Sequence, residues 1–220
     1  MSLQLAIVLF QDTPTLSASD VTAYLSANWS NLPVASETGE EDNTISFRLG
    51  TADVAIGIMP APVPWADLEG PCATGRLWPD SAAALSGHAA HAIVTMMGEL
   101  PAIQLSSLLT QVTAAVCGAS TQSLGVFWTN AVMVVRKDVF LDFATQILPK
   151  GSPLPIWVDF RVGRTESGNA SAGFTAGLAA LGLMEIEAQD ATESPSELRQ
   201  RLEAIAQYLV EHAQLSAVSG

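Results

Sequence analysis

Basic residues are scarce in this chain of 220 residues. Nine Lys and Arg stand against 22 Asp and Glu, which gives a formal net charge of −13 and a pI near 4.4. Binding to a phosphate backbone requires clustered Lys and Arg, and the single adjacent basic pair is Arg136-Lys137. We therefore expect no nucleic-acid partner and no binding to an anionic membrane surface.

Long hydrophobic runs and cysteine clusters are also missing. Mean hydropathy is +0.31, but the longest apolar runs are strand-sized and the region 92–118 is interrupted by polar residues, so we predict no membrane span. No basic residues precede the N-terminal apolar run, so no signal peptide is predicted. Cys72 and Cys117 form no C-x-x-C pair, which favours two free thiols in a reducing cytoplasm.

Apolar residues, in contrast, are plentiful. Hydrophobic residues make up 49% of the chain and charged residues 14%, a balance that excludes intrinsic disorder. Between Ser81 and Val135 the only charged side chain is Glu99. Such depletion of charge indicates either the central strands and a buried helix of the core or a subunit interface.

The order of elements suggests two similar cycles of strand, helix and hairpin. The first has a strand at 3–10, a helix capped by Ser17 and Asp20, an acidic loop at 36–43 and a hairpin of 44–49 with 53–59. The second has a strand at 88–97, a helix from Ile103 to Gly118 and a hairpin of 124–128 with 131–135. These patterns predict an α+β fold of βαββ units, mostly antiparallel and ferredoxin-like, with an internal duplication of period near 85 residues.

The boundary between the two units falls near residue 80. Residues 1–80 form the first unit with an irregular Trp- and Pro-containing segment at 60–80, and residues 81–220 form the second unit with further strands and a helix. We expect one compact domain overall. The further elements are a helix at 136–148, a strand at 156–162 with Trp157, Asp159 and Arg161 on one face, a strand at 184–188, and a final helix capped by Ser194, Pro195 and Glu197.

Short motifs in the second half resemble a known family. They are Trp157-Val158-Asp159-Phe160, Thr175-Ala176-Gly177-Leu178 and Gly182-Leu183-Met184-Glu185-Ile186-Glu187, with HAAHAIV at 88–94. Over roughly residues 85–210 the chain is similar to the bacterial domain-of-unknown-function family 4261. The resemblance implies an α+β fold in a bacterial, cytoplasmic protein, and it implies no activity.

His88 and His91 form an H-x-x-H pair. On a helix they would share a face and could bind a metal, but on the predicted strand a spacing of three places them on opposite faces. Cys72 could join as a third ligand, although no spacing rule supports it. The favoured interpretation is structural histidines, with no metal and no cofactor; the alternative is a metal-binding or acid–base role.

Glu185 and Glu187 are the other candidates for chemistry. On the predicted strand they share a face roughly 7 Å apart, a separation that paired-carboxylate catalysts use. Arg161 and Asp159 are expected on a neighbouring strand. The favoured interpretation is a solvated sheet face with Arg–Glu pairs.

Trp65, Trp78 and Arg76 lie in the irregular segment 60–80. An aromatic, proline-containing loop with a lone arginine can line a ligand groove or a partner surface, so we name these three and Arg161 as candidate binding residues. The alternative is a loop held on the core by its tryptophans.

Reactive side chains are too sparse for an evident catalytic centre. The prediction is therefore a non-catalytic binding or protein-interaction module, whose acidic surface would favour a basic protein partner. The alternatives are a metal-dependent hydrolase using His88 and His91, and a structural homo-oligomer subunit.

Overall fold

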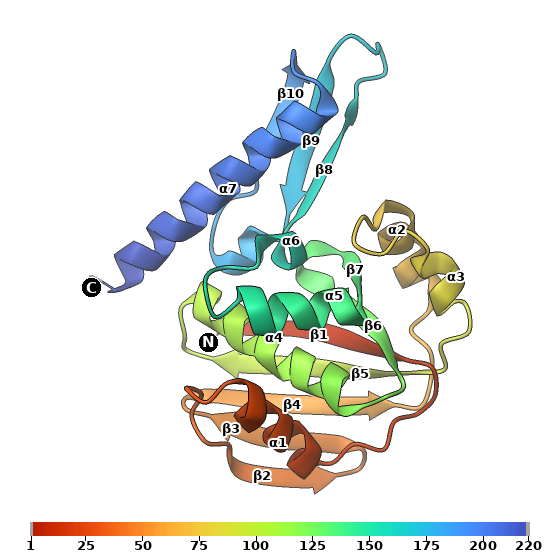
Figure 1. Cartoon of the computed structure of the whole chain (residues 1–220), viewed down its shortest axis with the longest axis vertical. Helices are drawn as coiled ribbons and strands as arrows, with labels where there is room; N and C mark the ends of the chain where they lie inside the picture. The colour runs from red at the N-terminus through yellow and green to blue at the C-terminus, as the bar shows by residue number, and fades with distance from the viewer. Residues whose placement is uncertain (1, 219–220) are drawn as a thin grey trace.

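The chain folds as a mixed α+β structure around one large antiparallel sheet (Figure 1). The computed structural model describes residues 2–218, and the side chains of residues 2–214. In order across the sheet, the seven strands are β2 (Ser36–Glu41), β3 (Thr44–Leu49), β4 (Ala52–Met59), β5 (Ala90–Gly98), β1 (Ser2–Phe10), β6 (Ser123–Trp128) and β7 (Met133–Arg136). The helices associated with this sheet are α1 (Ala18–Asn28), α2 (Trp65–Thr74), α3 (Ser81–Leu85), α4 (Ala102–Ala119), the 3-10 turn η1 (Thr129–Ala131), α5 (Lys137–Asp142) and the π-helical η2 (Phe143–Ile147).

The connections make the centre of the sheet ferredoxin-like. β1 and β4 are parallel with β5 between them, and β5 and β6 are parallel with β1 between them. Helices α1 and α4 make these two crossovers, so β1-α1-β4-β5-α4-β6 is a split βαβ arrangement. Because β1 lies between two strands of the second half, residues 1–80 and 81–220 contribute to one sheet.

Helix α4 occupies the middle of the core. Twelve of its 18 residues are buried, and it packs against α1, β1 and β5. Together with β5, β6 and β7, α4 makes up most of the charge-poor stretch at 81–135. The central strands and the buried helix place this stretch in the core. Within the described part of the chain, α4 is also the one helix whose length and composition would allow a membrane span, and 67% of it is buried inside the protein.

The opposite face of the sheet is covered at one end. There α2 and α3 enclose a second, smaller core that includes Leu9, Leu68, Cys72 and Trp78. The prediction of irregular structure over 65–80 was therefore wrong for 65–74, which is helical despite Pro71 inside it. Leu68, Pro71 and Cys72 are all buried, at the spacing of one helix face, and this burial offsets the hydrogen bond that proline cannot donate.

The acidic stretch at 36–43 is not a loop either. Residues 36–41 form the edge strand β2, and Asp42 and Asn43 turn the chain with φ of 45° and 62°. Charged side chains on an edge strand discourage pairing with another chain. The acidic residues of this hairpin are Glu37, Glu40, Glu41 and Asp42.

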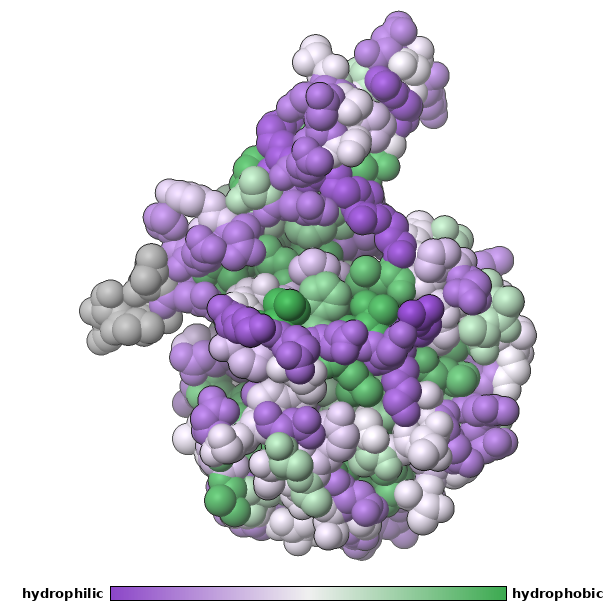
Figure 2. Space-filling view, in the orientation of Figure 1, coloured by the Kyte–Doolittle hydropathy of each residue, from purple (hydrophilic) through white to green (hydrophobic). Residues whose placement is uncertain are grey.

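The C-terminal part forms a protruding lobe (Figure 1). It has the short helix α6 (Leu154–Trp157), strands β8 (Asp159–Arg164), β9 (Ser171–Ala176) and β10 (Glu187–Ala191), the 3-10 turn η3 (Ala179–Leu181), and the long helix α7 (Pro195–Val218). The strand order is β10-β9-β8, and α7 packs on β8 and β9. In Figure 2, hydrophobic side chains gather where the lobe meets the main body below α7.

Two strand predictions in this lobe need correction. The strand predicted at 156–162 begins at Asp159, because 154–157 forms a helical turn with Pro155 at its start. Trp157, predicted on the same strand face as Asp159 and Arg161, is buried instead, and its Nε1–H donates to Thr110 Oγ1 at 2.8 Å, which ties the lobe to α4. The strand predicted at 184–188 lies at 187–191 instead.

Candidate functional site

A large hollow begins where α1 ends. Trp29 follows the helix, and its backbone N–H donates to the Leu25 carbonyl at 2.9 Å. Its ring packs on Tyr24 with centroids 6.4 Å apart. Tyr24 in turn lies so close to Gly118 of α4 that a Cβ there would come within 2.3 Å of the ring. This close approach of the two helices holds Trp29 as one wall of the hollow.

The turn between β3 and β4 forms a second wall. Gly50 has φ of +60°, a left-handed conformation that favours glycine. A Cβ on Gly50 would be 3.4 Å from the Pro33 ring, so the turn and the segment after Trp29 lie directly against one another. Together they border one end of the exposed side of α4.

The floor of the hollow is the exposed side of α4. Gln104, Ser107 and Gln111 recur at intervals of three and four residues, so they share one face of the helix. We call the whole hollow the α1–α4 groove. It is lined by Trp29, Asn31, Leu32, Pro33, Leu49, Gly50, Thr51, Leu100, Gln104, Ser107, Leu108, Gln111, Leu148 and Pro149.

The α1–α4 groove has a volume of about 770 Å³, within the range of small-molecule sites. Its walls are mainly apolar, and its lining includes no Asp, Glu, Lys, Arg or His. The polar groups are neutral amides and hydroxyls. Gln111 is 8% exposed, and its side-chain amide forms no hydrogen bond with another described residue. The amide atoms are also not completely buried. Its hydrogen-bonding groups are therefore free for a molecule in the groove.

Trp29 adds an unused donor to the same wall. The residue is 4% exposed, and its Nε1–H is buried with no hydrogen-bond partner among the described residues. An unpaired buried donor costs about 1–3 kcal/mol. Because this N–H has no exposed surface, a ligand in the groove reaches it only if the indole shifts.

A second hollow of about 350 Å³ continues from the first. Gln104 and Ser107 line both, so the two meet on the exposed side of α4. Its other wall is η3 and the later part of α7, through Leu181, Ala213 and Gln214. The combined surface therefore runs from α1 to the C-terminal lobe.

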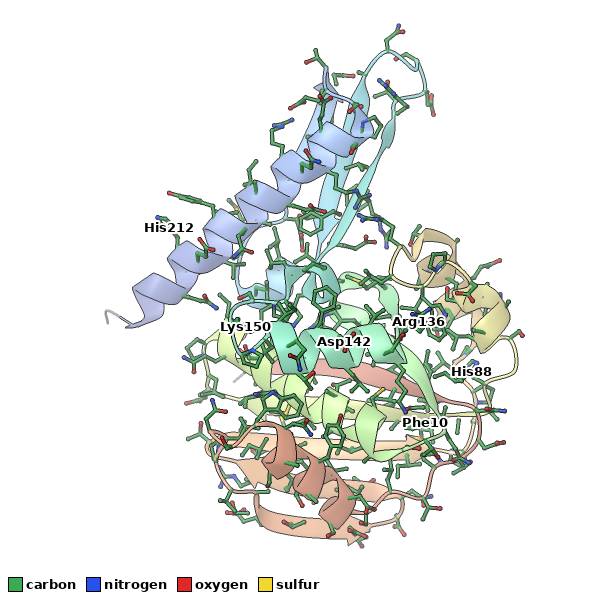
Figure 3. All side chains as sticks on the ribbon, viewed as in Figure 1. Phe10, His88, Arg136, Asp142, Lys150 and His212 are labelled. Carbon is green, nitrogen blue, oxygen red and sulfur yellow. The ribbon has the colours of Figure 1, made fainter. Side chains whose placement is uncertain are left out.

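The predicted candidates lie elsewhere. His88 precedes β5 and is buried beside α3 (Figure 3). Its Nε2 accepts a hydrogen bond from the Val63 N–H at 2.9 Å, and its Nδ1 donates to the Leu85 carbonyl at 2.7 Å. Both ring nitrogens are engaged by backbone, as the structural interpretation of this histidine predicts.

His91 and Cys72 do not complete a metal site with His88. His91 Nδ1 donates to the Ala61 carbonyl at 2.7 Å, so both histidines hold the proline-rich segment 60–64 on the sheet. Cys72 is a buried free thiol in the smaller core. Across residues 2–218, no group of three or more His, Cys, Asp or Glu is placed to hold a metal ion.

Glu185 and Glu187 do not form a pair on one strand face. Glu185 precedes β10, and its carboxylate accepts from Thr175 Oγ1 at 2.7 Å and from the backbone N–H groups of Gly177 and Ala179 at 2.8 and 2.9 Å. Glu187 accepts from Gln189 Nε2 at 2.7 Å. Glu185 therefore organises the chain between β9 and η3.

The tryptophans of segment 60–80 have different roles. Trp78 is 4% exposed and lies against Gly125, where a Cβ would be 2.4 Å from its ring. Trp65 begins α2 and is 42% exposed. The loop is thus held on the core by Trp78, and neither tryptophan lines the α1–α4 groove.

The two candidate arginines, Arg76 and Arg161, are connected through Asp159. Arg161 donates from Nε to Asp159 Oδ2 at 2.7 Å and lies 5.8 Å from the centroid of the Phe174 ring. Asp159 also lines a small cleft that contains Arg76. Asp159 thus links Arg161, which does not line the cleft, to the cleft that contains Arg76, 85 residues away in sequence.

The uncovered part of the second sheet face is a further surface. Its rows across β1, β5 and β4 are Leu3–Met97–Asp53, Leu5–Thr95–Ala55 and Ile7–Ile93–Gly57. Among these residues only Asp53 is charged, and it pairs with Arg48 at 3.0 Å. We call this surface the open sheet face.

Comparison with known proteins gives no assignment. No family model matches the chain, and no curated protein or solved structure matches it either. The resemblance to family 4261 therefore stays a prediction.

Sequence reasoning missed the groove because its residues carry no chemical signature. Trp29, Gly50 and Gln111 are separated by tens of residues and belong to no motif. One signal was present: Gln104, Ser107 and Gln111 form a polar stripe on a helix that is otherwise strongly apolar.

Proposed function

We propose that this protein is a non-catalytic binding module whose α1–α4 groove takes an uncharged, largely apolar ligand with hydrogen-bonding groups. The neutral lining of a 770 Å³ hollow carries this proposal. Apolar walls favour apolar surface, and a few free amides fix the orientation of a ligand. A charged ligand would lose its hydration there without gaining an opposite charge.

The same lining disfavours catalysis in the groove. General acid–base and nucleophilic mechanisms need a titratable group within hydrogen-bond reach of the substrate, and the groove lining contains none. A metal-dependent hydrolase using His88 and His91 has less support, since Nε2 of His88 is already taken by the Val63 N–H and no third ligand lies with the two histidines among the described residues.

Binding of the neutral dye Nile red tests this proposal. We expect saturable binding to the wild type, weakened at least tenfold in Gln111→Glu, because the new carboxylate would have to be desolvated. Gln122→Glu makes the same change on an exposed turn outside the groove and should bind as the wild type. Non-saturable binding, or equal loss in both variants, would contradict the proposal.

Self-association is a second candidate, favoured by the open sheet face. Two copies of a chain with net charge −13 repel one another except where the contact surface lacks charge. The open sheet face offers such a surface, about 10 by 14 Å from strand geometry. Its single carboxylate is already neutralised by Arg48.

Light scattering tests this second candidate. If the face joins two copies, the wild type should have the mass of a dimer and Ile93→Glu the mass of a monomer with unchanged circular dichroism. Gln122→Glu serves again as the charge-matched control. A monomeric wild type at high protein concentration would remove this candidate.

A further inference from the structure

A small cleft lies where the main body meets the C-terminal lobe. It has a volume of about 150 Å³ and is formed by four segments far apart in sequence. Arg76 follows α2, Asp159 begins β8, and Arg199 and Glu203 lie on α7. The tertiary fold thus gathers four charged side chains around one hollow in a chain with few basic residues.

Three of the seven arginines, Arg76, Arg164 and Arg199, have no ion pair within the described part of the chain, and two of these three line the cleft. Four other arginines, Arg48, Arg136, Arg161 and Arg201, form ion pairs with carboxylates at 2.6–3.4 Å. Arg76 and Arg199 form neither an ion pair nor a hydrogen bond with any described residue. In a chain with 22 acidic residues, two unpaired guanidinium groups lining one cleft leave their donors available to a ligand.

The carboxylates of the cleft do not remove its positive charge. Asp159 is engaged by Arg161 at 2.7 Å, and Glu203 lies beyond 4.0 Å of Arg199. Arg161 does not line the cleft but compensates the charge of Asp159, so the lining charges that remain are Arg76 and Arg199 against Glu203, a net charge of +1. This is the reverse of the sign of the whole chain.

The electrostatics at Arg199 agree with this count. Burial lowers the pKa of the Arg199 guanidinium, and the positive charge of Arg76 lowers it further, while Glu203 and Asp159 act in the opposite direction. The charged form of Arg199 is therefore held without full compensation. An anion in the cleft would supply the missing compensation.

Size restricts the anion. A water molecule occupies about 30 Å³ in the liquid, so the cleft has room for about five. That space accommodates one phosphate or carboxylate group. The planar guanidinium fork is suited to oxygen pairs of such groups.

We propose that this cleft is a binding site for a small oxyanion, a phosphate or carboxylate group, held between the guanidinium groups of Arg76 and Arg199. The site is separate from the α1–α4 groove, with which it shares no lining residue. An occupied site would also join α2 of the main body to α7 of the lobe.

Titration with inorganic phosphate and with acetate, each at constant ionic strength, tests this site. Calorimetry and thermal melting should both report binding of at least one of the two ions to the wild type. Arg76→Gln and Arg199→Gln should each weaken it about tenfold or more, because a charge-assisted contact is lost. Arg164→Gln is the matched control, since Arg164 also has no ion pair and lies outside the cleft.

The outcomes distinguish a phosphorylated ligand from a carboxylate ligand, and a specific site from none. Tighter binding of phosphate indicates a phosphorylated ligand, and tighter binding of acetate indicates a carboxylate. Arg76→Lys keeps the charge but loses the fork, so it should bind more weakly than the wild type and keep its melting temperature without anion. Absence of binding by both ions, or equal weakening by Arg164→Gln, overturns the proposal.

Discussion

The two faces of the seven-stranded sheet differ although one strand supplies both. On β5, Ala92, Val94 and Met96 are fully buried beneath α1 and α4, whereas their neighbours Ile93 and Thr95 are partly exposed. Both sets are mainly apolar. Apolar residues on both faces of a strand therefore indicate a central position in the sheet. Which of the two faces is buried depends on where the helices pack.

The difference between the faces extends to the candidate sites. The covered face carries the α1–α4 groove at its margin, where two helices and a turn leave a neutral hollow. The opposite face has α2 and α3 at one end and the open sheet face beside them. A ligand site and a site for a second copy would thus lie on different sides of one sheet.

The largest expected effect distinguishes the two faces directly. Val94→Asp places a carboxylate in the core beneath α4 and should destabilise the protein by about 4 kcal/mol or more. Thr95→Asp, the next residue on the open side, should cost about 1 kcal/mol. Urea unfolding measures both, and equal losses would show that the two faces are equally enclosed.

The contact that holds the helices over the covered face gives the next effect. Gly118→Ala would drive a Cβ into the Tyr24 ring, so we expect a loss of about 1–3 kcal/mol. Gly70→Ala in α2, where nothing lies within 4 Å, should be neutral or stabilising by about 0.5–1 kcal/mol. A harmless Gly118→Ala would mean that α1 can shift, and the groove with it.

The histidines test the partly covered end of the second face. His88→Leu leaves the Val63 N–H and the Leu85 carbonyl without partners, which should cost about 1–3 kcal/mol in thermal or urea unfolding. His91→Leu removes one contact from a more exposed site and should cost less. The reverse order would contradict the structural role assigned to His88.

The smallest effect concerns neither face. Hydrogen bonds from Ser194 lower the pKa of the Glu197 carboxyl below its ordinary value of 4.5, so its contribution to stability is present above that pH and is lost as pH falls through the folded pKa. Melting temperatures between pH 6 and pH 3 should show a smaller acid-induced loss in Glu197→Gln than in the wild type. An identical acid dependence would show that this cap does not stabilise α7.

Much of the fold was predictable because it rests on local signals. The capping boxes of Ser17 with Asp20 and of Ser194 with Glu197 are both present, and the apolar run at 3–10 is a central strand. Both hairpins also formed, with small changes in their bounds. Caps and strand periodicity depend on residues within a few positions of one another, so sequence alone contains them.

The errors arose where burial overrode local composition. Pro71 suggested a loop, yet the burial of Leu68 and Cys72 made 65–74 helical. Trp157 was predicted to share a strand face with Asp159 and Arg161, yet its indole donates a hydrogen bond to Thr110 in the core. In both segments the deciding contacts were with residues far away in the chain.

Composition and periodicity were enough to predict an acidic α+β protein with few reactive groups and a central segment that carries a single charged residue. The tertiary structure alone decided that the neutral groove lies beside α4, and that Arg76 and Arg199 share a cleft from positions 123 residues apart. The physical reason is that local propensity and periodicity act over a few residues, whereas a binding site depends on which distant segments pack together.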